Sequence, residues 1–162
     1  MNEIRNYEIK VVHYKDLKYS KQCYKILKKY PHRFENCEKS LYVDYIVCET
    51  ENDKVLAFAT VKKRGPNQCD LSVEEVVVDT DEKGKFHEIR LMKYIKRHSK
   101  GAKRVCMIVK KDDQQTIQIL KNVSMKIIEV CDEKKYFKFA IDSEKVANNE
   151  RIRYNVEEKD LS

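Results

Sequence analysis

Two adjacent carboxylates, Glu74 and Glu75, lie in a run of β-branched residues that predicts a strand over 71–78. A polar turn and the basic segment 83–85 follow, and the apolar spacing after them predicts an amphipathic helix over 86–98. Because neighbouring side chains of a strand point to opposite faces, one of the two glutamates can face a cleft and accept a proton there. The N–H groups of the helix start, next to basic side chains, favour an anion. This stretch therefore predicts a general base beside an anion-binding turn.

The length and the charge of the chain limit the function classes. With 162 residues, the chain is long enough for one domain with a core, and we expect this domain over 1–142, followed by a polar segment over 143–162. Charged residues make up 38% of the sequence, well above the roughly 25% of an average soluble protein, which indicates a heavily solvated surface. The net charge of +7 fits either the phosphates of a nucleotide-like cofactor or a nucleic acid.

The cysteines and histidines indicate neither disulfides nor a metal. The six cysteines are spread singly without a Cys-x-x-Cys pair, which is typical of small buried side chains in a reducing compartment. The four histidines do not cluster or share a spacing with acidic residues, so we expect no metal site. No apolar run approaches the roughly 18 residues of a membrane span, and the first residues show no signal-peptide pattern. The sequence thus predicts an intracellular, cytoplasmic protein without a membrane segment.

The remaining patterns predict a mixed α/β fold. A first helix is expected to end before Pro31, and Asp113 is expected to cap a later helix. Since a helix joins the strands 71–78 and 104–109, these strands should be parallel neighbours in one sheet. Further strands are expected at 8–14, 41–49, 55–61, 127–131 and 136–141.

The residues from 73 to 92 form a strand, a glycine-containing turn and an amphipathic helix in an order that resembles motif A of the Gcn5-related N-acetyltransferases (GNAT). The order of the expected elements resembles that family over roughly residues 8–141. The resemblance implies the acyl-CoA N-acyltransferase (GNAT) fold, a mixed and mostly antiparallel sheet with a central, splayed parallel pair. It also implies that the protein transfers an acetyl group from acetyl-CoA to an amine.

The same resemblance implies a coenzyme site along the predicted strand and turn. Backbone N–H groups of the strand would meet the thioester carbonyl, and the turn with the helix start would hold the pyrophosphate. The catalytic candidates are then Glu74 and Glu75, as the base that removes a proton from the amine. The string from Glu74 to Val78 is similar to one in the glucosamine 6-phosphate N-acetyltransferases, which implies an amino sugar phosphate or another small amine as the acceptor. The cofactor-binding residues implied by the resemblance are Val76, Val77, Val78, Lys83, Gly84, Lys85, Phe86, His87, Glu88 and Asp113.

Three positions depart from the family pattern. The family has small residues where Phe86 and Glu88 stand, because a side chain there would collide with the phosphates. It has a tyrosine general acid where Leu120 stands, so a tyrosine at this position would be expected to raise turnover. Two interpretations therefore stay open: an active N-acetyltransferase, and a catalytically degenerate protein of the same fold that acts as a binding or structural subunit. A basic, nucleic-acid-associated protein is the third interpretation, because the net charge allows it.

The segment 143–162 is too polar to add to a core, although Ile152, Tyr154 and Val156 alternate as one face of a strand would. We expect this segment to add a strand to an exposed edge of a second copy or of another protein. The sequence therefore predicts a homodimer or a protein partner bound through the C-terminal segment.

Overall fold

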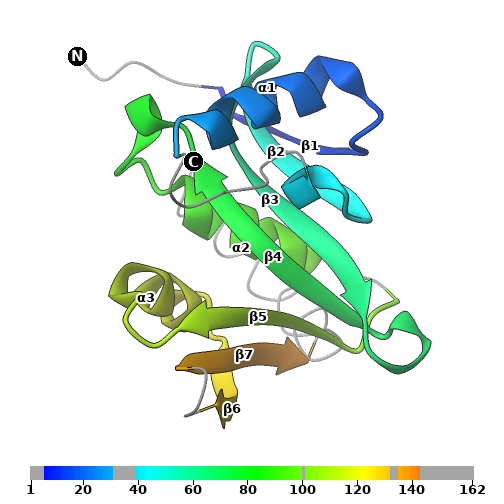
Figure 1. The fold of residues 1–162 in the computed structure, drawn as a ribbon, viewed down its shortest axis with the longest axis vertical. Helices are drawn as coiled ribbons and strands as arrows, with labels where there is room; N and C mark the ends of the chain where they lie inside the picture. Colours follow the sequence, from blue (N-terminus) through cyan, green and yellow to red (C-terminus); the bar gives the residue numbers. More distant parts are fainter. Residues whose placement is uncertain (1–5, 31–38, 100, 132–134, 143–162) are drawn as a thin grey trace. The chain divides into compact units, whose positions relative to one another are not determined.

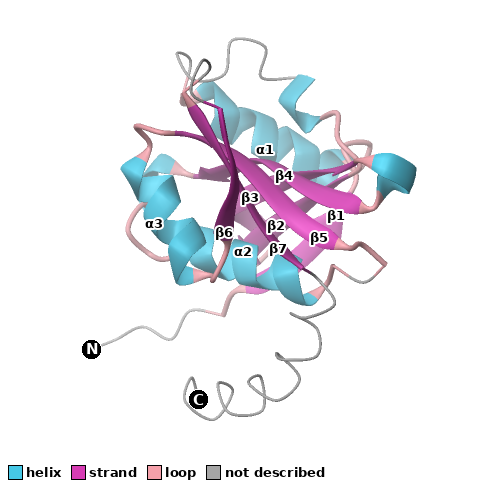
Figure 2. Cartoon of the chain, turned by 90° about the horizontal axis from the view of Figure 1, so that it is seen from below, coloured by secondary structure: helices cyan, strands magenta, loops and turns pink. Residues whose placement is uncertain are grey.

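The computed structural model describes residues 6–30, 39–99, 101–131 and 135–142, and these form one mixed sheet with helices (Figure 1, Figure 2). The strand order is β1-β2-β3-β4-β5-β7-β6, in which β4 and β5 are parallel. The expected fold class, a mixed and mostly antiparallel sheet with a parallel pair, is thereby confirmed. The strands are β1 (Glu8–Val12), β2 (Tyr45–Glu51), β3 (Lys54–Arg64), β4 (Asp70–Val78), β5 (Arg104–Lys110), β6 (Lys126–Cys131) and β7 (Tyr136–Asp142). The helices are α1 (Leu17–Lys28), α2 (His87–Arg97) and α3 (Gln114–Asn122), with short 3-10 turns η1 (Lys39–Leu41), η2 (Pro66–Gln68) and η3 (Thr80–Glu82).

Two predicted boundaries are wrong by a few residues. The strand expected from residue 41 onward begins at Tyr45, because the chain before it forms the 3-10 turn η1. The helix expected over 86–98 begins at His87, because Phe86 has a φ of 63°. A positive φ lies outside the right-handed helical region, so Phe86 belongs to the preceding loop.

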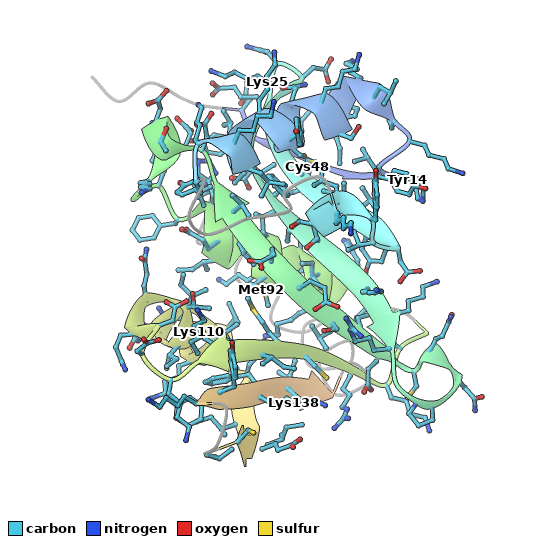
Figure 3. The ribbon with its side chains drawn as sticks, viewed as in Figure 1. Tyr14, Lys25, Cys48, Met92, Lys110 and Lys138 are labelled. Atoms are coloured by element: carbon cyan, nitrogen blue, oxygen red, sulfur yellow. The ribbon has the colours of Figure 1, made fainter. Side chains whose placement is uncertain are left out.

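The chain forms two compact units, and the first contains residues 1–62 and 73–91. Its core lies between α1 and the strands β2, β3 and β4 (Figure 1). Cys23 and Cys48 meet there with 3.8 Å between their Sγ atoms, and Figure 3 places Cys48 beside α1. The hydrogen bond with Cys48 and burial raise the pKa of the Cys23 thiol, which fits the small buried hydrophobes that the sequence predicts. The buried cluster comprises Tyr19, Cys23, Ile26, Leu27, Leu41, Ile46, Cys48, Val55, Phe58 and Val77.

The second unit contains residues 63–72 and 92–162. Residues 143–162 lie outside the described residues, and so does the strand addition that was expected for them. The first residues of β4 pair with β5 in parallel over three residue pairs, and β7 pairs with β5 on its other side. The prediction that 71–78 and 104–109 are parallel neighbours is confirmed, as is the antiparallel closing hairpin of β6 and β7. The buried side chains of this unit include Val105, Met107, Val109, Ile117, Leu120 and Phe139.

A bidentate ion pair ties β4 to β5 where the two strands pair. Arg104 donates from Nε to Oδ1 of Asp70 and from Nη2 to Oδ2, each at 3.0 Å. The hydrogen bonds from Arg104 are the main cause that lowers the pKa of Asp70. Gly65 lies against this carboxylate with a φ of 80°, and an added Cβ would lie 3.0 Å from Oδ2. Both the backbone conformation and the lack of room therefore favour glycine at this position.

Replacing Gly65 with alanine is expected to lower the free energy of unfolding more than the same change at Gly101. Both glycines have positive φ, which costs an alanine about 1 to 2 kcal/mol. An added Cβ at Gly101 meets no heavy atom of the described residues within 4 Å, whereas at Gly65 it meets the Asp70 carboxylate. Overpacking at Gly65 should add at least about 1 kcal/mol to the shared cost. Chemical denaturation of the two variants measures the difference, and equal losses would show that the Asp70 side chain moves aside freely.

Candidate functional site

The loop Lys83–Phe86 joins β4, through the turn η3, to the start of α2 (Figure 1). All of its side chains are exposed, and Phe86 is 67% exposed. Gly84 has a φ of 82°, and a Cβ built on it would meet no heavy atom of the described residues within 4 Å. The loop therefore presents its backbone and its two lysines to solvent, with open space beside the glycine.

The first turn of α2 follows this loop directly. The Phe86 carbonyl accepts the first helical hydrogen bond, from the Arg90 N–H at 3.2 Å, so Phe86 occupies the capping position. Its side chain has no oxygen that could accept from the N–H groups of the first turn, which lack intrahelical partners in any α-helix. The dipole of the helix adds partial positive charge at this end. The loop and the helix start together form a geometry that suits an anion.

Beneath the loop lies a buried cluster that we call the His87 clasp, made of Glu49, Glu82, His87 and Arg90. His87 is fully buried and its Nε2 lies 3.1 Å from Oε1 of Glu82. Its Nδ1 contacts Oε1 of Glu49, which is 1% exposed and belongs to β2. Each ring nitrogen therefore lies against a carboxylate oxygen, and Nδ1 also lies 3.0 Å from Nη2 of Arg90.

Arg90 completes the clasp from the next turn of α2. Its Nε donates to both carboxylate oxygens of Glu49, at 2.9 and 3.0 Å. Its guanidinium also lies over the ring of Tyr7, with 4.7 Å from Cζ to the ring centroid. Burial would raise the pKa of Glu49, but the hydrogen bonds from His87 and Arg90 together with their charges outweigh it, so this pKa lies below its ordinary value. Glu49 is thus held as a carboxylate inside the first unit.

The residues that follow α1 contact the end of β4 and the loop after it. Tyr30 donates its hydroxyl to the carbonyl of Val78, the last residue of β4, at 2.6 Å. Lys29 forms an ion pair with Asp79 at 2.6 Å, and its pKa is raised mainly by this hydrogen bond. Nζ of Lys83 lies 5.3 Å from the centroid of the Tyr30 ring. One lysine of the loop is therefore held near the point where β4 ends.

The two candidate glutamates lie midway along β4. Glu74, Glu75 and Val76 are all half-buried, whereas Val77 and Val78 are buried. The N–H of Glu75 donates to Oγ1 of Thr60 at 3.1 Å, so a side-chain hydroxyl takes the place that a ladder carbonyl has in a regular sheet. Neither carboxylate is excluded as the base, and both remain candidates.

Two further sequence candidates belong to the second unit. Asp113 caps α3 as predicted: its Oδ1 accepts from the Thr116 N–H at 3.1 Å and its Oδ2 from the Thr116 hydroxyl at 2.7 Å. Leu120 is fully buried in α3, so a tyrosine there would overpack the core at a cost of about 1 to 3 kcal/mol. The expectation that Leu120→Tyr raises turnover stays a prediction, and the burial of Leu120 adds this packing cost to it.

Three members of the clasp, Glu49, Glu82 and Arg90, were not predicted as site residues from the sequence. Glu49 follows the β-forming run 45–48, and a charge placed in a buried strand requires a partner. This signal could have marked Glu49, but the pattern alone does not say which cation or histidine it meets. His87 was expected at the coenzyme, and the structure instead buries its side chain in the clasp.

Two other features were searched for in the described part of the chain. It contains no group of three or more His, Cys, Asp or Glu side chains arranged to hold a metal ion. None of its helices has the length and apolar character needed to cross a membrane.

The fold is that of known acetyltransferases. The structure is similar to aminoglycoside 6'-acetyltransferase type Ii, with a TM-score of 0.69 and 14% identity over 84% of this chain and 97% of that chain. It is similar to a GNAT-family acetyltransferase from Bacillus cereus, with a TM-score of 0.65 and 11% identity over 85% and 97% of the two chains. A third similar structure is that of yncA from Salmonella typhimurium with its cofactor acetyl-CoA, with a TM-score of 0.58 and 12% identity over 85% and 94%. No protein-family model and no curated protein matches the sequence. At these identities the likeness establishes the fold.

Proposed function

We propose that this protein is an acetyl-CoA-dependent N-acetyltransferase that acts on a small amine. The observation that carries the proposal is the start of α2 behind an exposed loop with two lysines, which follows β4 and the short turn η3. A coenzyme with a pyrophosphate suits such a site. The fold shared with acetyltransferases, including yncA with acetyl-CoA, supports the same assignment.

The residues present fit the coenzyme at its phosphate half. The first-turn N–H groups of α2 would donate to the pyrophosphate, and Gly84 leaves room for its approach. Lys83 supplies positive charge at the surface, while Lys85 forms an ion pair with Glu82. The backbone N–H groups of Val76 to Val78 would donate to the thioester carbonyl, in the manner that the family resemblance implies.

The chemistry is an acyl transfer between a thioester and an amine. Acetyl-CoA supplies the acetyl group: the amine nitrogen forms a bond to the carbonyl carbon, and the carbon–sulfur bond breaks to release the thiolate. Glu74 or Glu75 removes the proton that the amine nitrogen loses, directly or through water. Solvent protonates the thiolate, because thiols are good leaving groups with a pKa near 8.5 for cysteine. The acceptor is an amino sugar phosphate or another small amine, as the resemblance of the β4 string implies.

Two measurements test the proposal. Calorimetry with acetyl-CoA and with desulpho-coenzyme A should give a dissociation constant below roughly 100 µM, about −5.5 kcal/mol. Release of free thiol from acetyl-CoA across a panel of amino sugars, polyamines and peptide N-termini should identify an acceptor. Absence of heat at millimolar ligand would overturn the proposal.

The second candidate function is a catalytically degenerate protein of the same fold. Phe86 favours it, because a ring that is 67% exposed occupies a place where the family has a small residue. Coenzyme binding without thiol release from any acceptor would select this function. If the protein neither binds coenzyme A nor releases thiol from acetyl-CoA, but binds a nucleic acid, the third interpretation, a nucleic-acid-associated protein, would be selected.

Replacing Phe86 with glycine is expected to tighten coenzyme binding several-fold. The exposed ring stands where the family pattern has a small residue, and the Phe86 φ of 63° is strained for a residue with a Cβ. Because Phe86 precedes α2, glycine here avoids the cost of about 1 kcal/mol that it has inside a helix. Relief of the strained backbone should also stabilise the fold by about 1 kcal/mol.

Phe86→Ala is the matched control, because it removes the ring and keeps the strain. Calorimetry and thermal unfolding of both variants separate the two effects. A further change of Glu88 to glycine should tighten binding again by removing a carboxylate, at a cost of about 1 kcal/mol in helix stability. Unchanged affinity in a folded Phe86→Gly protein would mean that the loop does not receive phosphate.

A further inference from the structure

The two ends of the loop Lys83–Phe86 are joined beneath it. Glu82 is the last residue before the loop and His87 is the first after it, and their side chains meet at 3.1 Å. Both residues are buried. A contact between the residues that flank a loop fixes the distance between its ends, so fewer loop conformations remain accessible. The clasp therefore restricts the directions of the loop N–H groups.

The clasp also holds the loop against the sheet of the first unit. Glu49 lies on β2, which pairs with β1 and β3 on its two sides. His87 and Arg90 both contact the Glu49 carboxylate from α2. Two attachment points one turn apart fix the position and the rotation of the helix start. The first turn of α2 is thus fastened to a rigid element.

Each oxygen of the Glu82 carboxylate has a partner within the clasp or the loop. Oε1 of Glu82 faces His87, and its Oε2 accepts from Nζ of Lys85 at 2.9 Å. A free carboxylate at this position would repel a pyrophosphate. The ion pair with Lys85 compensates that charge, which weakens the repulsion of an anion at the loop.

We propose that His87 is a positioning residue for the coenzyme. Through Glu82 and Glu49 it holds the loop and the first turn of α2 in the conformation that receives the pyrophosphate. The inference rests on the proposed function and deepens it. It assigns the role to the buried imidazole, whereas the family resemblance implies only a coenzyme contact at this position.

The test compares His87→Ala with His87→Gln, since glutamine retains donor groups that can reach a carboxylate. With acetyl-CoA, we expect His87→Ala to raise KM about tenfold or more while kcat stays within about twofold, because ground-state and transition-state binding are lost together. His87→Gln should recover part of the loss. With S-acetylpantetheine, which lacks the pyrophosphate, kcat/KM should be the same in wild type and variants. This selectivity separates a positioning role from a general loss of structure.

A destabilised control variant separates the effect on KM from a loss of stability, and a hydrogen-exchange measurement reports on the loop without any assay of turnover. Phe139→Leu creates a cavity in the core of the second unit, where Phe139 is 1% exposed, and should lower the melting temperature without changing KM. Amide hydrogen exchange of the peptide containing residues 83–88 should be faster in His87→Ala than in wild type and unchanged in Phe139→Leu. If His87→Ala does not fold, Glu82→Gln replaces it in every measurement.

The outcomes distinguish the two proposals. A wild-type protein that binds coenzyme A, combined with unchanged KM and unchanged exchange in the His87 variants, would overturn only the positioning role. Equal losses with acetyl-CoA and S-acetylpantetheine would also overturn it, because the effect would not depend on the pyrophosphate. A wild-type protein that does not bind coenzyme A would overturn the proposed function and this inference with it.

Discussion

Replacing Glu49 with alanine is expected to lower the free energy of unfolding by about 3 to 5 kcal/mol, because it leaves buried partners of a removed charge unpaired. The carboxylate is 1% exposed and accepts hydrogen bonds from Arg90 while contacting His87. Glu49→Gln should lose less, since its amide oxygen still accepts one hydrogen bond. Urea denaturation of the three proteins measures these differences.

Asp53→Asn is the matched control for Glu49→Gln. Asp53 also has several partners, with Lys10 at 2.7 Å and Lys18 at 3.1 Å, but its side chain is 47% exposed. Exposed ion pairs contribute little because water screens them, so this variant should stay close to wild type. Asparagine is chosen because the residue has a φ of 62°, which asparagine tolerates. Similar losses in Asp53→Asn and Glu49→Gln would contradict the importance assigned to burial.

The Glu49 carboxylate should make the free energy of unfolding depend on pH in the acidic range. The pKa of Glu49 is lowered in the folded protein, so the unfolded state binds more protons over the range between the two values. The stabilisation is fully present above the unfolded pKa of about 4.3 and is lost as pH falls through the folded pKa. The difference in unfolding free energy between wild type and Glu49→Gln should therefore shrink between pH 6 and the most acidic pH at which both fold. A difference that stays constant or grows in acid would show that Glu49 is not the responsible group.

Changing the glutamate that we propose as general base to glutamine is expected to lower turnover by about a hundredfold or more, the usual effect of losing a general base. Glu74→Gln and Glu75→Gln should differ sharply, because adjacent strand residues point to opposite faces and one carboxylate reaches the amine. The thiol-release assay with the best acceptor of the panel measures both. In the affected variant the fall of kcat/KM on the acid side of the pH profile should disappear, since glutamine does not titrate.

Glu129→Gln on the exposed strand β6 is the control for a lost carboxylate away from the proposed chemistry. It should keep the wild-type rate. Retention of full turnover in both the Glu74 and the Glu75 variants would discard the catalytic assignment. Loss of turnover in both to the same extent, with reduced melting temperatures, would instead indicate that the change disturbs β4.

The order of strands and helices could be predicted from the sequence because it depends on local patterns. Alternating and 3.6-residue apolar periods specify β2, β3, β5 and the helices, and the crossover length specifies that 71–78 and 104–109 run parallel. The cap of α3 by Asp113 was predicted for the same reason, since it joins residues three apart. The resemblance to the acetyltransferases rested on this order, and the shared fold agrees with it.

The clasp could not be predicted, because Glu49 and His87 are 38 residues apart in the chain. A buried charge says that a partner exists, and only the packing of α2 on the sheet says which one. The positive φ of Phe86 was likewise decided by the tertiary structure, since the apolar period of the helix continues through this position in the sequence. Local patterns fix which face of an element is apolar, whereas the contacts between elements distant in sequence fix which polar groups meet inside the fold.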